Sequence, residues 1–268
     1  MNKLAISIRA FNRADYLKQE LDSLARCDRV DEVDFYILQC GAVNKWSGIR
    51  RAEDEEIEES LKVIKNCKLK NVEVNMTGGI GNHEQKWLQM TELFDKRGYD
   101  YVMLIDNDLI FTKDYISTIL NLFEKYKESE YGTIQTSYRY TPETPTETVE
   151  YAKENREKVH EGFSYRWEMG FWRRTWEKIK PRFKEYVQAV GNQDFYSMYK
   201  DPELQKPLKD RFGGHSADHN LELAVQEAGL KGLCTDVLRH KTIGTEGYFT
   251  VFKDNWKERQ LDRIVIHD

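Results

Sequence analysis

The chain has 268 residues, of which 40% are hydrophobic, 32% charged and 12% aromatic, and its formal net charge is −5. This composition excludes a disordered chain, and the length suits one large α/β domain or two small ones. The mildly acidic balance, 41 Lys and Arg against 46 Asp and Glu, gives no support for nucleic acid as a partner.

The N-terminal sequence MNKLAISIRAF reaches a charge at Arg9 and lacks the long apolar segment of a secretory signal. No window approaches the apolar length that a membrane span needs, so we expect no transmembrane segment. The four cysteines are widely spaced, as is typical of reduced thiols rather than a disulfide framework. Together these features predict a cytoplasmic protein.

Strands and helices are predicted to alternate over the first 105 residues. Short, mostly apolar runs typical of buried strands occupy residues 4–10, 33–38, 72–76 and 101–105. Helical spacing of apolar residues predicts a helix through residues 16–24, a second across roughly 52–66, and a third through residues 87–93 after a turn-rich loop at 77–82. This alternation implies right-handed crossovers and an α/β fold with a doubly wound, mostly parallel sheet.

Beyond residue 138 the pattern is harder to interpret. Residues 140–160 indicate a loop and a solvated helix, and the aromatic run 163–172 is interpreted as a strand lining a cleft. Residues 181–215 have weak periodicity and predict no element. A helix is predicted over 216–229, with Gly229 at its C-terminal cap, followed by a last strand at 230–238.

Two carboxylates, Asp106 and Asp108, directly follow the predicted strand 101–105. Ligands of an open parallel sheet bind at the carboxyl ends of its strands, near a switch in strand order. Two carboxylates one residue apart can converge on Mg²⁺ or Mn²⁺, which often bridges substrate phosphates and would stabilise a leaving nucleoside diphosphate. Acidic pairs are also common in turns and helix caps, so the pair alone leaves a structural role open.

Five segments, in the same order along the chain, resemble the motifs of GT-A-fold glycosyltransferases, particularly the large family-two group. They are Ala5–Arg13 with Tyr16-Leu17, Gly79–Asn82, Tyr101–Asp108, Glu168–Arg174 with Trp176–Ile179, and Ser216–Leu223 with Ala228-Gly229. The resemblance covers about residues 1–240. It implies a single GT-A-like domain, 1–268, with a Rossmann-like nucleotide-sugar-binding half at 1–110, a variable acceptor and catalytic half at 111–240, and a tail at 241–268.

Matched by position, the resemblance implies a donor site and a metal site. The nucleotide-sugar would be bound by Arg9, Ala10, Phe11, Asn12, Gly81, Asp106 and Asn107. A Mn²⁺ or Mg²⁺ ion would be held by Asp106, Asp108 and His240, although His240 alone is as readily a surface or capping histidine. Lys86 is available for phosphate contact, or it lies on a solvated helix face.

The resemblance also implies Asp218 as the catalytic base that takes the proton of an acceptor hydroxyl. The alternative for Asp218 is a residue at the start of a helix, where the macrodipole favours an acid. The family's Glu-Asp pair is reduced here to Ala217-Asp218, so Asp194 is a competing base candidate.

The predicted function is metal-dependent transfer of a sugar from a nucleotide-sugar donor to an unidentified acceptor hydroxyl, with inversion as in most family-two enzymes and retention still open. The family's D-D-G-S stretch is replaced by residues 39–42 (QCGA), which leaves the nucleotide base open. A non-catalytic binding or scaffold protein of the same fold is an alternative. A sugar-phosphate nucleotidyltransferase is another, but the first strand is not followed by the Gly-rich loop of that class.

Overall fold

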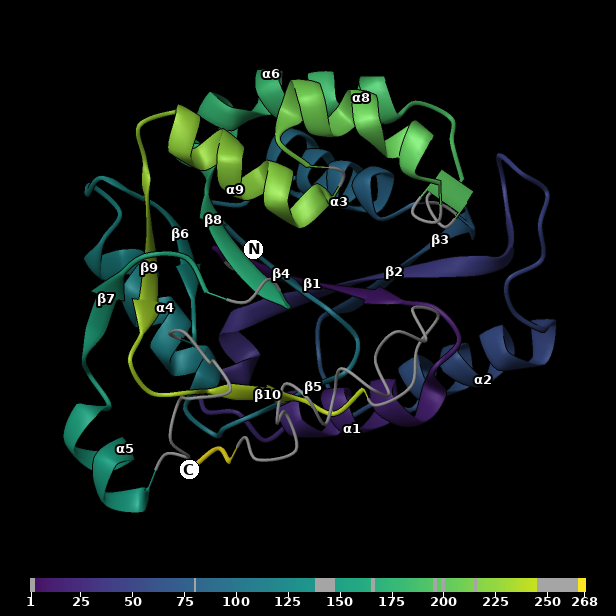
Figure 1. The fold of residues 1–268 in the computed structure, drawn as a ribbon. Coiled ribbons are helices and arrows are strands. Elements are labelled where there is room, and N and C mark those ends of the chain that lie inside the picture. The colour runs from purple at the N-terminus through teal and green to yellow at the C-terminus, as the bar shows by residue number, and fades with distance from the viewer. Residues whose placement is uncertain are drawn as a thin grey trace.

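The computed structural model describes residues 3–79, 81–137, 148–164, 167–194, 197–198, 201–214, 216–244 and 265–268. Its centre is an eight-stranded sheet with the order β3-β2-β1-β4-β8-β6-β9-β7 (Figure 1). The strands in that order are Val72–Gly79, Val33–Asn44, Leu4–Ala10, Tyr101–Ile105, Glu168–Trp172, Tyr131–Gln135, Lys231–Thr235 and Val159–Glu161.

The first four strands in sequence, β1 to β4, are parallel to one another. They are joined by helices α1 (Ala14–Leu24), α2 (Asp54–Lys65) and α3 (Asn82–Met90), and α3 continues as the π-helical turn η2 (Thr91–Lys96). β1 lies between β2 and β4, so the winding reverses direction between β3 and β4. The carboxyl ends of β1 and β4 therefore meet at a topological switch point.

The second half of the sheet mixes strand directions. β8 is antiparallel to both β4 and β6, β9 is parallel to β6, and β7 is antiparallel to β9. Four of the seven pairings are thus parallel, which confirms a mostly parallel α/β sheet. The expectation that residues 163–172 line a cleft is wrong for β8. That strand is fully buried at the centre of the sheet because its two neighbours and helices on both faces enclose it.

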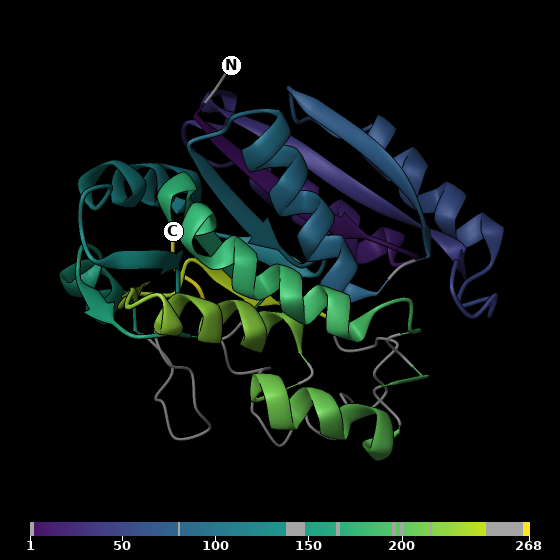
Figure 2. The ribbon, with the colours of Figure 1, turned by 90° about the horizontal axis from the view of Figure 1, so that it is seen from above.

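Helices cover both faces of the sheet, as a doubly wound fold requires (Figures 1 and 2). Helices α1, α2 and α4 (Tyr115–Lys125) bury apolar residues in one core cluster. Helices α3, α6 (Arg173–Val190), α8 (Pro202–Phe212) and α9 (Ala217–Glu227) bury theirs in a second cluster on the opposite face. The described helices also include the short η1 (Val30–Glu32) and α5 (Val149–Asn155).

The predicted elements of the first half are confirmed, with β2 extended to Asn44 and β3 to Gly79. The predicted helix over 216–229 is confirmed as α9, and Gly229 has the positive φ of 70° expected at a helix end. Helices α6 and α8 were not predicted. The interpretation of residues 140–147 falls outside the described part of the chain.

A second, two-stranded sheet pairs β5 (Leu109–Phe111) with β10 (His240–Thr242) in antiparallel fashion. The Ile243 amide donates to the Asp108 carbonyl at 2.8 Å, so the chain after β9 returns to the residues that follow β4. Among the helices of the described residues, none is both long and apolar enough to cross a membrane.

Candidate active site

Two opposite charges join the ends of β1 and β4. Arg9 lies near the end of β1, and Asp106 follows β4, where its amide donates to the Trp167 carbonyl at 2.9 Å. The Arg9 guanidinium donates to Oδ1 of Asp106. This ion pair therefore lies at the switch point, where the sequence placed Asp106, and the roles of both residues in donor binding stay predictions.

Asp106, Asn107 and Asp108 are together called the acidic motif. Arg13 binds its other two residues. Its Nη1 donates to Oδ2 of Asp108 at 2.9 Å and its Nη2 to Oδ1 of Asn107 at 2.6 Å. Each of the three motif residues is thus bound by an arginine, either Arg9 near the end of β1 or Arg13 just before α1. Arg13 was absent from the predicted site, although a basic residue in the first βα connection of a doubly wound sheet is a signal that could have identified it.

Lys86 and Asp218 form the second ion pair of the site, between α3 and α9. The Lys86 Nζ and Asp218 Oδ1 atoms are 2.5 Å apart, and the lysine side chain is only 4% exposed. Burial lowers the pKa of Lys86 to about 8, while the charge of Asp218 opposes this effect and that of Arg9 adds to it. The alternative interpretation of Lys86 as part of a solvated helix face is therefore wrong.

The influence of Arg9 on the pKa of Lys86 indicates that the two ion pairs are neighbours. They bring together side chains from β1, the segment after β4, α3 and α9. Asp106 and Asp218 remain partly exposed, so a ligand can reach them. Cations suited to a diphosphate and carboxylates suited to a metal ion or a base thus meet at one place.

Glu20 of α1 is close enough to Asp108 for the two carboxyl groups to interact electrostatically. The sequence did not identify Glu20 as part of the site. Its carboxyl group is fully buried, and burial raises its pKa well above the usual value, with a further contribution from the charge of Asp108. The Leu109 amide opposes this shift. The spacing of Glu20 with the buried Leu17, Leu21 and Leu24 already placed it on the apolar face of α1.

His240 is not brought to the acidic motif. In the antiparallel pairing of β10 with β5, His240 lies opposite Phe111, whereas Thr242 lies opposite Leu109. The His240 Nδ1 is 3.0 Å from Oγ1 of Thr136 and 3.5 Å from Oε1 of Glu168, and burial lowers its pKa. The structure gives His240 an interior hydrogen-bonding role, so its prediction as a metal ligand beside Asp106 and Asp108 finds no support.

The competing base candidate, Asp194, binds the loop that follows β2. Its Oδ2 accepts hydrogen bonds from Oγ of Ser47 at 2.6 Å and Nη2 of Arg51 at 2.5 Å, and its side chain is 3% exposed. A carboxylate this enclosed by two donors of its own chain is poorly placed to accept a proton from a substrate.

Three of the remaining predicted donor residues lie at or directly after the end of β1. Ala10 ends β1 and is buried, the Phe11 carbonyl accepts from Nε2 of Gln39 at 2.7 Å, and the Asn12 amide donates to Glu56 at 3.3 Å. Oε1 of Gln39 is buried and has no hydrogen-bond partner among the described residues. Gly81 is the N-cap residue of α3.

The acidic motif supplies only some of the ligands that a divalent cation needs. Within the described residues, no group of three or more His, Cys, Asp or Glu side chains is arranged to bind a metal. Asp106 and Asp108 nevertheless offer hard carboxylate oxygens, and the arginine contacts engage only one oxygen of each. This donor set fits Mn²⁺ or Mg²⁺ if the bound substrate supplies further oxygen ligands.

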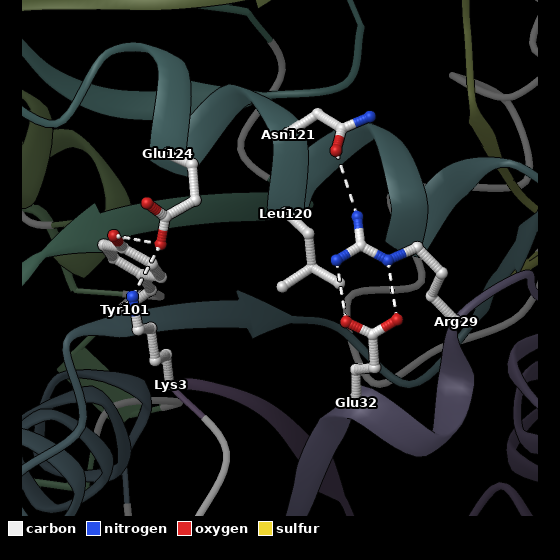
Figure 3. Close-up of a pocket in the computed structure, with 7 residues that line it drawn as sticks. All are labelled: Lys3, Arg29, Glu32, Tyr101, Leu120, Asn121 and Glu124. Atoms are coloured by element: carbon white, nitrogen blue, oxygen red, sulfur yellow. Dashed lines mark hydrogen bonds and ion pairs between the residues drawn. The ribbon is translucent and has the colours of Figure 1, made fainter.

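In the described part of the chain, a pocket lies beside the N-terminal ends of β1 and β4, at the opposite end of these strands from the site. Figure 3 shows its lining. Its charged side chains bind one another: Arg29 pairs with Glu32 and Asn121, and Glu124 accepts from Lys3 and Tyr101. These contacts use the polar groups of the lining, so we assign the pocket no part in the chemistry.

No protein-family model matches the sequence, and no curated protein matches it either. Among solved structures, the chain is similar to S. aureus TarS 1–349, with 11% identity, a TM-score of 0.48, and coverage of 89% of this chain and 59% of that chain. It is also similar to apo mouse xyloside xylosyltransferase 1, with 10% identity, a TM-score of 0.46, and coverage of 84% and 81%. The chain spans about three fifths of the TarS structure, and we base the functional proposal on the geometry of the site.

Proposed function

We propose that the chain is a GT-A-type glycosyltransferase that transfers a sugar from a nucleotide-sugar donor to an acceptor hydroxyl. The observation that supports this most strongly is the meeting of the Arg9–Asp106 and Lys86–Asp218 ion pairs at the carboxyl ends of β1 and β4. That switch point is where α/β sheets of this kind bind their ligands.

The basic side chains of the site suit the diphosphate of a donor. Guanidinium groups bind phosphate oxygens with two parallel hydrogen bonds, and Lys86 adds a compact charge nearby. Asp106 and Asp108 would hold Mn²⁺ or Mg²⁺ through the oxygens that the arginines do not engage. The ion would stabilise the negative charge that develops on the leaving nucleoside diphosphate.

Asp218 is the base that we propose for the acceptor. Its Oδ1 lies 2.5 Å from Nζ of Lys86, and this ion pair fixes the position of the carboxylate at the site. Asp218 would take the acceptor hydroxyl proton while the acceptor oxygen bonds to the anomeric carbon and the bond to the diphosphate breaks. A single displacement of this kind inverts the anomeric configuration.

Release of nucleoside diphosphate from a panel of UDP-, GDP- and dTDP-sugars, with and without Mn²⁺, tests the proposal. We expect metal-dependent release with at least one donor, and Asp218→Asn should abolish turnover while donor binding persists. Glu227→Gln, an exposed change on the same helix, is the matched control and should leave both unchanged. Failure of every nucleotide to bind in the presence of Mn²⁺ would refute the proposal, and binding without turnover would favour the scaffold alternative.

A further inference from the structure

We propose that Arg9 and Arg13 neutralise the carboxylates of the acidic motif until a donor binds. Their guanidinium groups then release the carboxylates and bind the donor diphosphate. In the free protein they hold Asp106 and Asp108, so a divalent cation binds tightly only together with a nucleoside diphosphate. This inference rests on the proposed function and adds an order of binding to it.

The contacts of the acidic motif support the first part of this inference. Arg9 binds Asp106, and Arg13 binds both Asn107 and Asp108, so one short segment supplies a cation to each carboxylate. The Asp106 and Asp108 side chains are 27% and 15% exposed, which leaves them within reach of a ligand. A cation that enters must therefore compete with guanidinium groups already in place.

The chain after β10 is packed tightly against the Arg13–Asp108 pair. A Cβ atom at Gly244 would lie 2.1 Å from Oδ2 of Asp108 and 3.1 Å from Nη1 of Arg13. The absence of a side chain at Gly244 thus leaves the space that the ion pair occupies. This close fit encloses the ion pair within the fold.

The charges of the site support the second part. Among the described residues of the site, Arg9, Arg13 and Lys86 pair with Asp106, Asp108 and Asp218, so the charges of these side chains balance. A diphosphate alone would add about two negative charges to this partly buried site, and a divalent cation alone about two positive ones. The two ligands together restore the balance, so each should favour the binding of the other.

The carboxylates and the guanidinium groups each gain a better-matched partner when the cation and the diphosphate bind. Carboxylate oxygens are the ligands that Mn²⁺ and Mg²⁺ prefer, and the planar guanidinium fork matches phosphate oxygens. The charge of Arg9 contributes to the lowered pKa of Lys86, so the two cations are neighbours at the site. Because binding free energies are reciprocal, the diphosphate must tighten cation binding by the same factor as the cation tightens diphosphate binding.

Isothermal titration of the full chain measures this coupling. Mn²⁺ is titrated alone and with saturating UDP, GDP or dTDP, and each nucleotide is titrated with and without Mn²⁺. We expect each ligand to tighten the other by about tenfold or more. In Arg13→Gln, Mn²⁺ alone should bind more tightly than in the wild type, and the coupling should shrink.

Arg29→Gln is the matched control, because Arg29, like Arg13, binds one carboxylate and one asparagine side chain (Figure 3) but lines the pocket away from the site. It should leave every binding constant unchanged. Equal Mn²⁺ affinity with and without nucleotide, or weaker Mn²⁺ binding in Arg13→Gln, would overturn the inference while leaving glycosyl transfer intact. If no nucleotide binds, the proposed function fails, and the Mn²⁺ affinity of Arg13→Gln still decides the role of Arg13.

Discussion

Replacement of Lys86 by methionine tests the buried ion pair at the centre of the site. Burial lowers the pKa of Lys86 from 10.5 to about 8, even though Asp218 opposes the change. The folded protein therefore releases this proton at a lower pH than the unfolded chain does. A lysine of this kind destabilises the fold most below about pH 8, and the destabilisation fades as the pH rises toward 10.5.

The size of the effect follows from the two pKa values. At pH 7 the gap between 10.5 and about 8 corresponds to about 3 kcal/mol of lost stability. At about pH 9.5 the folded state has lost the proton and the unfolded state mostly retains it, so about 1 kcal/mol remains. The wild type should therefore gain about 2 kcal/mol from Lys86 over this range, and Lys86→Met should gain nothing from that position.

Urea denaturation of the two proteins at about pH 7 and about pH 9.5 measures the difference in their free energies of unfolding. Other groups titrate in both proteins, so the comparison isolates Lys86. The stability of Lys86→Met relative to the wild type should fall by about 2 kcal/mol between the two pH values. If the two proteins instead change in parallel, Lys86 does not carry a buried charge and the account of the ion pair is refuted.

Three further substitutions test separate parts of the structure. The raised pKa of Glu20 makes the wild type lose stability as pH rises above the usual carboxyl range, and urea midpoints at about pH 5 and pH 7.5 should show that Glu20→Gln removes this loss. Gly170→Ala places a Cβ atom 2.7 Å from Sδ of Met103, so thermal unfolding should show a loss of about 1–3 kcal/mol. His240→Gln should cost about 1–3 kcal/mol but leave Mn²⁺ affinity with nucleotide unchanged, and a loss of Mn²⁺ binding would restore His240 as a ligand.

The first half of the fold could be predicted because its strands are short apolar runs between polar segments. Leu4–Ala10 and Tyr101–Ile105 are buried along almost their whole length, and their composition shows it. Parallel pairing and the crossover rule then fix where these strands end relative to one another. The position of Asp106 at the carboxyl end of β4 follows from the strand before it.

The second half could not be predicted in the same way. Helix α6 contains Pro181, which is normally a reason to end a helix, although its buried residues Trp176, Ile179, Phe183 and Tyr186 recur at helical spacing. Strand β8 enters the sheet antiparallel to β4, and no local pattern specifies which edge a strand will join. Its central position depends on contacts between segments far apart in the sequence.

Among the site residues, too, features set by the local sequence could be predicted, whereas contacts between distant segments could not. The positions of Asp106 and Asp218 in the fold could be predicted because Asp106 follows a recognisable strand and Asp218 lies in the first turn of a recognisable helix. The burial of Lys86 was missed because its partner comes from α9, and a lysine in a polar helix normally faces water.

His240 shows most clearly what sequence motifs cannot predict. In a short strand such as β10, the register with the neighbouring strand decides what each side chain contacts. Pairing with Phe111 sends His240 to Thr136 and Glu168, whereas Gly244 is the residue that reaches Asp108. Register between β10 and β5 is set by tertiary packing, and a small slip would move every side chain of the strand. A motif that matches by position therefore identifies a strand near the site without identifying which of its residues faces the ligand.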